Sequence, residues 1–345
     1  MKLDNAFFDA ETEVIGSGPA KTGKIQISEK NTKYFISLLT KVYSDPIGSI
    51  VREITSNCFD AHRKVGKVAP VVIRHYIDVD TDQEFIDFVD QGTGLSPITM
   101  DEIYMSLGES DKRESDDYLG AFGLGSKSPF SYVTNLGYFY VITKVNNLQY
   151  TYLLNETQAG ITYDLLSTIP TESENGTTIR IPFEKPSDKE LFRVALIQQL
   201  QYFDDVFVFG FDKPADRWGQ GGEAFNNDYT IVEHSTFKYR ADLLEKDHNQ
   251  RLHVAYGPVN YPIDFNVLGI RPVNLNVALK FELGELDVIL NREQLKYTDK
   301  TIAALKEKFA AFVEEMRELW LCPANLEFTD IYEYLQHATE LSNGK

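Results

Sequence analysis

The sequence predicts an α+β fold, in which helices pack on a mixed, mostly antiparallel sheet. Two amphipathic helices are expected, over residues 47–66 and 299–321, because apolar side chains recur there at every third or fourth position. Short runs rich in β-branched and aromatic residues lie between them and are typical of strands. Helices combined with antiparallel strands form α+β layers around a hydrophobic core.

The composition is that of a folded, acidic protein. Of its 345 residues 43% are hydrophobic, which supports one large domain or two ordinary ones. The net charge of −18 argues against non-specific binding of nucleic acid, and we expect no sequence-specific nucleic-acid partner. The sequence has two cysteines, no recognisable signal peptide and no apolar run near the roughly 18 residues of a membrane span. A cytoplasmic location is therefore predicted.

The first half of the chain is expected to contain two helices followed by strands. Residues 1–24 are predicted to be an arm or an edge strand, and residues 28–43 a helix. The helix at 47–66 follows Asp45 and Pro46, since proline suits a first helical turn. Strands are predicted at residues 71–76, 85–89, 137–144, 148–154 and 177–181, with a turn at Asn146 and Asn147.

A polar stretch with a proline, residues 184–188, marks a predicted boundary between one domain over residues 1–185 and another over 186–345. The stretch at 277–290 is predicted to form two strands joined at Gly284, and Pro323 to end the last helix. The other elements expected in this half are a helix at 189–203, a loop at 211–229, a strand at 252–256 and the helix at 299–321.

The helix at 47–66 carries a second stripe, which is polar. Glu53, Asn57 and Asp60 are spaced four and three positions apart and share one helix face. At about 100° per residue, this face flanks the apolar stripe. Two carboxylates and an amide there can hold a metal ion and a water; the alternative is a solvated helix face.

A second candidate site follows the strand at 85–89. Asp90 comes directly after that strand, and Gly92 and Gly94 follow. An aspartate there can accept a hydrogen bond, while the glycines let the backbone pass close to a flat ligand. The alternative is a polar β-turn.

The third candidate is a glycine-rich segment, G-A-F-G-L-G-S-K, over residues 120–127. Glycines at this spacing let backbone N–H groups converge on a phosphate, helped by a following helix N-terminus and by Lys127. A P-loop is excluded because Ser126 separates Gly125 from the lysine, and a Rossmann fingerprint because residue 128 is serine. The alternative is a flexible turn.

Together these motifs resemble those of the GHKL ATPase superfamily, whose nucleotide-binding domain has the Bergerat fold. E-x-x-x-N-x-x-D-A is followed by D-x-G-x-G, then G-x-F-G-x-G, then Gly-Thr at residues 176–177. The first three segments are similar to those of the ninety-kilodalton heat-shock chaperones. G-A-F-G-L-G-S-K-S-P-F-S-Y and L-D-V-I-L-N-R-E-Q-L resemble the rapid-lysis IIA protein family of tailed phages. The resemblance implies a two-layer Bergerat sandwich over residues 1–185, followed by a transducer-like or middle-like domain.

The resemblance also implies roles for single residues. Glu53 would be the general base, Asn57 would hold Mg²⁺, and Asp60 would support the metal's ligand shell. Asp90 would accept a hydrogen bond from the adenine amino group, backed by Thr177. The nucleotide-binding candidates are Asn57, Asp60, Asp90, Gly92, Gly94, Leu95, Lys112, Gly120, Phe122, Gly123, Leu124, Gly125, Ser126, Lys127 and Thr177.

Residues 106–126 would form a lid whose backbone amides bind the phosphates. Lys112 and Lys127 are the cationic candidates near them; the alternative for each is an ordinary surface lysine.

Arg292 matches the place where the chaperones carry a middle-domain arginine that reaches the γ-phosphate. Such an arginine would stabilise transition-state charge and complete a catalytic pair with Glu53. The alternative is an ion pair of Arg292 with Glu293 or Asp299.

The function implied by this resemblance is slow, Mg²⁺-dependent hydrolysis of ATP, with lid closure and homodimerisation as a switch. An unidentified host or phage protein would be a further partner, in the cytoplasm of an infected cell. One alternative is a non-catalytic nucleotide-binding protein, peripherally associated with the inner membrane, that antagonises a host defence. Another is a chaperone-like or MutL-like ATPase.

Overall fold

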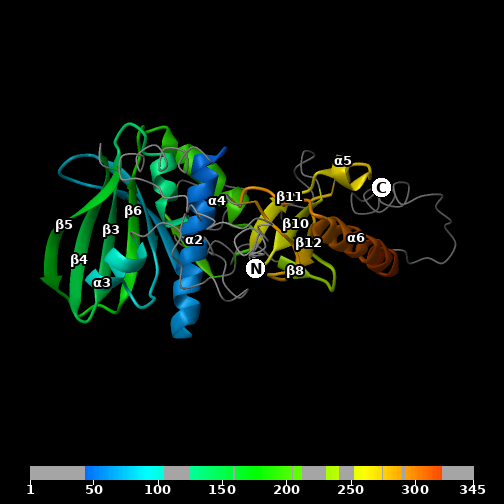
Figure 1. The fold of residues 1–345 in the computed structure, drawn as a ribbon, viewed down its shortest axis with the longest axis horizontal. Coiled ribbons are helices and arrows are strands. Elements are labelled where there is room, and N and C mark those ends of the chain that lie inside the picture. The colour runs from blue at the N-terminus through cyan, green and yellow to red at the C-terminus, as the bar shows by residue number, and fades with distance from the viewer. Residues whose placement is uncertain are drawn as a thin grey trace, which may run out of the picture.

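The computed structural model describes residues 43–104, 125–157, 160–203, 205–211, 231–240, 252–273, 275–289 and 292–320. Within them, helices combine with two mixed, mostly antiparallel sheets, so the predicted α+β class is confirmed. Figure 1 shows the first sheet and its helices in one half of the molecule, and the second sheet with helix α6 in the other. None of the described helices is long and apolar enough to cross a membrane. The arm and the helix predicted before residue 43 lie outside the described residues.

The first sheet has seven strands in the order β5-β4-β3-β6-β2-β1-β7, and only the β1–β7 pair is parallel. Its strands are β1 (Val71–Ile77), β2 (Glu84–Val89), β3 (Tyr138–Val145), β4 (Leu148–Thr157), β5 (Gly160–Pro170), β6 (Gly176–Pro182) and β7 (Val206–Phe209). Five of them lie where the sequence predicts strands; β5 and β7 are not predicted. Because β7 pairs with β1, the first sheet continues past residue 185.

The turn between β3 and β4 lies where it is predicted. Asn146 and Asn147 both adopt left-handed backbone angles, with φ of 53° and 60°. Two such residues in a row match the right-handed twist of a tight hairpin. On its other side β3 pairs with β6, which places Thr143 opposite Thr177, at the edge of the candidate site.

Helix α2 (Pro46–Val65) lies across one face of this sheet, beside α4 (Asp188–Gln199) (Figure 1). Its first turn is capped by Asp45, whose carboxylate accepts a hydrogen bond from Gly48 N at 3.0 Å. Gly66, at φ 62°, ends the helix in a left-handed cap. Four residues of the predicted apolar stripe are buried, Ile50, Val51, Ile54 and Cys58, whereas Val65 at its C-terminal end is 43% exposed.

Three short helical segments border the predicted lid. Helix α3 (Pro97–Thr99) leads into the π-helix η3 (Met100–Tyr104). The 3₁₀ helix η4 (Gly125–Ser131) begins at residue 125. Because η4 packs on α2, the end of the glycine-rich segment lies against the polar stripe.

The second sheet has five strands in the order β11-β10-β12-β9-β8, with β10 and β12 parallel. Its elements are β8 (Ile231–Glu233), β9 (Phe237–Arg240), β10 (His253–Tyr256), β11 (Val259–Pro262), α5 (Phe265–Leu268), β12 (Ala278–Phe281) and α6 (Asp299–Trp320). The sequence predicts β10, α6 and, as the first of the two strands over residues 277–290, β12; α4, which packs beside α2, is also predicted.

The prediction of two strands over residues 277–290 is wrong for the second of them. After β12, the chain turns at Gly284, and Val288 forms only an isolated bridge with Leu295. Asp287 N donates to the Thr301 hydroxyl at 3.0 Å, so this backbone amide bonds to the first turns of α6 and not to a strand. The result is a tight hairpin that carries residues 292 and 293 at its tip.

Candidate functional site

Asp90 sits at the carboxyl end of β2, where it organises the turn that follows. Its Oδ1 accepts hydrogen bonds from Gly92 N at 2.8 Å and Thr177 N at 3.2 Å. Its backbone N–H donates to Thr177 O at 2.9 Å. Within the described part of the chain nothing donates to Oδ2. Burial raises the pKa of Asp90 to about 6, although the two backbone donors act in the opposite direction.

The glycines around Asp90 are required by packing within the chain. A Cβ on Gly94, at φ 72°, would lie 2.2 Å from Lys144 O, and one on Gly92 would lie 2.7 Å from the Ala61 Cβ. A Cβ on Gly176 would lie 2.2 Å from Asp90 O. The sequence predicts that Gly92 and Gly94 let a base approach the backbone. The contacts within the chain already require glycine at both positions, so the presence of glycine does not test that prediction.

Two residues that the sequence patterns miss hold this turn in place. Thr143 Oγ1 accepts from Leu95 N at 2.7 Å and lies 3.5 Å from the Thr177 hydroxyl. His62 Nε2, on α2, accepts from Gln91 N at 2.8 Å. A buried threonine in a strand and a histidine near a helix end have no pattern that marks them as part of a site.

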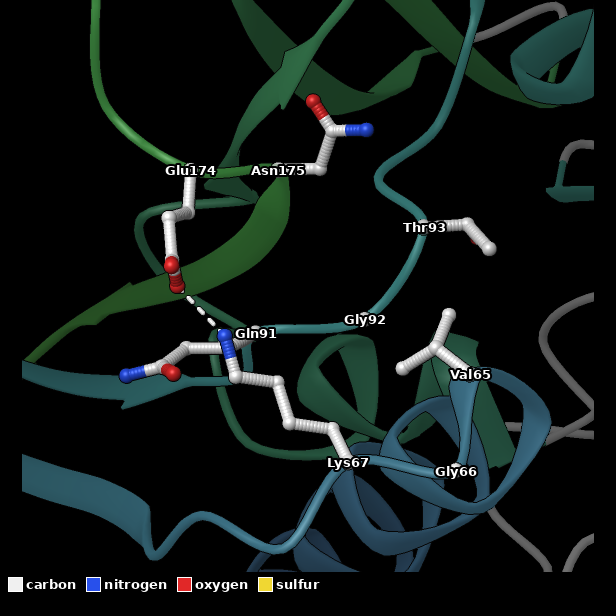
Figure 2. Close-up of a pocket in the computed structure, with 8 residues that line it drawn as sticks. All are labelled: Val65, Gly66, Lys67, Gln91, Gly92, Thr93, Glu174 and Asn175. Atoms are coloured by element: carbon white, nitrogen blue, oxygen red, sulfur yellow. Dashed lines mark hydrogen bonds and ion pairs between the residues drawn. The ribbon is translucent and has the colours of Figure 1, made fainter.

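A cavity of about 600 Å³ opens beside this turn, at the end of α2. Lys67 and Glu174 face one another there and form an ion pair (Figure 2). Its lining consists of Val65, Gly66, Lys67, Gln91, Gly92, Thr93, Glu174 and Asn175. Of the predicted site residues only Gly92 lines it, so this cavity lies next to the predicted base-binding position.

The polar stripe of α2 is far less exposed than a solvated helix face. Glu53 is 4% exposed, Asp60 is fully buried and Asn57 is partly buried. The glycine-rich segment ends directly against Glu53, because a Cβ on Gly125 would lie 2.6 Å from Glu53 Oε2. Glu53 and Gly125, predicted to belong to one site, are therefore neighbours.

Two arginines face the Glu53 carboxylate. Arg52 Nε lies 3.3 Å from its Oε1, and Arg292 Nη1 lies 3.6 Å from its Oε2. All three side chains are buried. Arg292 thus reaches Glu53, not the alternative partners Glu293 or Asp299, and it does so from a left-handed backbone conformation at φ 55°. Arg52 is a further residue that the patterns miss.

Lys127 is buried and turned toward η3. Its ammonium donates to Tyr104 O and, at 2.8 Å, to the Ser126 hydroxyl, and lies 4.8 Å from the centre of the Tyr104 ring. Burial lowers its pKa to about 8. The alternative of a surface lysine is therefore excluded for Lys127, and its contacts join the two described ends of the predicted lid.

The other lid residues lie outside the described part of the chain: Lys112, Gly120, Phe122, Gly123 and Leu124. Among the described residues no group of three or more His, Cys, Asp or Glu could hold a metal ion by itself. The predicted Mg²⁺ ligand is different in kind, a single amide whose metal would share its shell with phosphates.

Comparison with known proteins adds no assignment. No protein-family model matches the sequence, and no curated protein matches it.

Proposed function

We propose that this chain binds ATP with Mg²⁺ and hydrolyses it slowly. The observation that supports this most is that two segments, distant from one another in the sequence, pack along α2. Gly125 lies against Glu53 at one end, and the Asp90 turn packs on Ala61 and His62 about 12 Å further along the helix axis. One helix thus borders both a place for a base and a place for phosphates.

The Asp90 turn has the chemistry to select an adenine. Oδ1 is fixed by two backbone donors, and Oδ2 remains as a charged acceptor for an exocyclic amine. Thr177, whose backbone N–H donates to Oδ1, would add its own hydroxyl as a second polar group of this turn. A ketone oxygen at the same place, as in guanine, would meet a carboxylate and be rejected.

The polar stripe fits the phosphate end. Asn57 lies one helical turn from Glu53, and its amide oxygen is a ligand of the kind that Mg²⁺ accepts alongside phosphate oxygens. Bound there, the metal would neutralise phosphate charge. Arg52 and Arg292 supply two guanidinium groups beside the same place.

Turnover requires Glu53 to exchange a partner. In ATP + H₂O → ADP + phosphate, Glu53 would accept the proton of the attacking water. Both of its oxygens now face arginines. A γ-phosphate carries more negative charge than a carboxylate, so it would draw Arg292 away and free Glu53 Oε2. This exchange would make hydrolysis slow and dependent on the hairpin that carries Arg292.

The second candidate is a protein that binds nucleotide without hydrolysing it. The observation in its favour is the same pairing, because both carboxylate oxygens of Glu53 face arginines and neither is left to hold the attacking water. Dimerisation, a phage origin and a protein partner are further parts of the proposal and depend on the family resemblance.

Phosphate release and ATP binding by Glu53 variants separate the two candidates. Glu53→Gln and Glu53→Ala should bind ATP within about threefold of the unaltered chain, while turnover falls by about 10²–10⁴-fold. Glu172→Ala, at an exposed position, is the control and should leave both unchanged. Turnover that survives in Glu53→Gln would remove Glu53 as the base, and an unaltered chain that binds ATP without turnover would favour the second candidate.

A further inference from the structure

Glu293, next to Arg292 at the tip of the hairpin, makes a dense set of hydrogen bonds to the start of α2. Its Oε2 accepts from Ser44 N at 3.1 Å and from the Ser44 hydroxyl at 2.9 Å. Its Oε1 accepts from Asp45 N at 3.0 Å and from the Ser49 hydroxyl at 2.9 Å. Both carboxylate oxygens are thus used, by four donors from a segment 244 to 249 positions away in sequence.

These donors hold Glu293 as a carboxylate. Burial alone would raise its pKa, but the hydrogen bonds from Asp45, Ser44 and Ser49 outweigh burial and keep the pKa below the ordinary value. Two of the donors are backbone amides that precede the first turn of α2. Glu293 therefore completes, from another part of the chain, the capping that Asp45 begins.

The hairpin that carries Glu293 is itself closed. Ile289 N donates to Gln294 O at 3.1 Å, and Arg292 N donates to Ile289 O at 2.9 Å. The base of the hairpin is fixed by the Val288–Leu295 bridge. Glu293 directly follows Arg292 in the chain, so a contact that holds Glu293 also limits where the backbone of Arg292 can lie.

Arg292 needs that support. Its left-handed backbone conformation is disfavoured for a side chain with a Cβ, so it must be maintained by the surroundings. The two neighbouring side chains reach two places on one helix: Glu293 the N-terminus of α2, and Arg292 the Glu53 carboxylate about two turns along.

We infer that Glu293 is a positioning residue, which fastens the hairpin to α2 and so holds Arg292 at Glu53. The inference rests on the proposed ATPase function. It assigns to Glu293 no contact with the nucleotide. A change at Glu293 should therefore lower the rate of hydrolysis and leave binding of ATP intact.

The test compares Glu293→Gln with Gln294→Ala, a matched control at an exposed side chain of the same hairpin. In Glu293→Gln the amide nitrogen faces one backbone N–H, of Ser44 or of Asp45, which can only donate, so that hydrogen bond is lost, whereas the serine hydroxyl on the same side can turn to accept. We expect kcat to fall by about ten- to hundredfold, with KM and the Kd for ATP within about twofold. In an Arg292→Ala background, Glu293→Gln should cause no further loss. The inference would be overturned if Glu293→Gln lowered kcat by the same factor in the Arg292→Ala background as in the unaltered chain, or if it changed KM alone.

Hydrogen exchange without nucleotide tests the fastening contact separately. In Glu293→Gln one of the two amides, that of Ser44 or that of Asp45, should exchange at least tenfold faster than in the unaltered chain and in Gln294→Ala. Unchanged exchange would overturn the contact even if ATP is hydrolysed. Absence of turnover in the unaltered chain would overturn the proposed function and the catalytic part of this inference, and exchange would then decide on the contact alone.

Discussion

Replacing Asp90 by asparagine exchanges one side-chain oxygen for an NH₂ group and reverses the chemistry of the proposed base-binding position. Oδ1 accepts from Gly92 N and Thr177 N, so the side-chain oxygen of the asparagine must take that place. The amide nitrogen then occupies the position of Oδ2. A purine amino group that met an acceptor in the unaltered chain now meets a donor.

The effect on stability can be worked out from the pKa of Asp90. Burial raises this pKa from 3.8 to about 6, so the ionised carboxylate is disfavoured in the folded state by up to about 3 kcal/mol at pH 7. The stability that Asp90 contributes is complete below pH 3.8 and is lost as the pH rises through 6. An asparagine cannot ionise and keeps both backbone hydrogen bonds. At pH 7 the variant should therefore be as stable as the unaltered chain, or more stable by at most about 3 kcal/mol.

Whereas Asp90→Asn is expected to keep or raise stability, it is expected to weaken the binding of ATP. Losing a hydrogen bond to a charged acceptor costs about 1.5–3 kcal/mol, and burying two unsatisfied donors against each other adds about 1–3 kcal/mol. The sum, about 2.5–6 kcal/mol, is a loss of ATP affinity of roughly 70-fold or more. Affinity for GTP should fall less, because a guanine oxygen can accept from the new amide.

Calorimetric titration with ATP and GTP measures the affinities, and urea denaturation at pH 7 and 5.5 measures the stabilities. Asp80→Asn, in the exposed β1–β2 turn, is the control and should change neither. The stability gained by Asp90→Asn should shrink at pH 5.5. Unchanged ATP affinity in a folded Asp90→Asn protein would refute the base-binding assignment. A variant less stable by more than about 1 kcal/mol at pH 7 would refute the argument from burial.

Two further predictions concern the same turn. Burial lowers the pKa of His62 below 6.5, so the stability that the neutral ring provides is complete above pH 6.5 and is lost as the pH falls through the lowered pKa. His62→Gln keeps an acceptor for Gln91 N but does not titrate. Between pH 7 and 5 its free energy of unfolding, measured by denaturation, should therefore fall less than that of the unaltered chain. Equal falls of the two proteins over this pH range would contradict the prediction. Gly94→Ala should lower the free energy of unfolding by about 2–4 kcal/mol, because Gly94 has a left-handed φ and a Cβ there would lie 2.2 Å from Lys144 O. Gly66→Ala is the matched control: Gly66 has a similar φ but nothing within 4 Å of its Cβ position, so the loss should be about 1–2 kcal/mol. Equal costs in urea denaturation would show that the close approach at Gly94 is unimportant.

The sequence by itself determined what is encoded within single elements. Helix α2 follows from its apolar stripe, Asp45, Pro46 and the glycine at its end, all of which act over a few residues. The strands β1 to β4 and the Asn146–Asn147 turn follow from local composition for the same reason. The stripe of Glu53, Asn57 and Asp60 on one helix face also follows from helical geometry alone.

Only the tertiary structure decided which distant groups meet. The pairing of β7 with β1 depends on which sheet edge is left open, and neither strand carries a local sign of it. The contacts of Arg292 with Glu53 and of Glu293 with Ser44 join positions about 240 residues or more apart. From charge alone, Arg292 could pair with any of several carboxylates. The choice is made by burial, because a charge removed from water must take the partner that the packed core brings within reach.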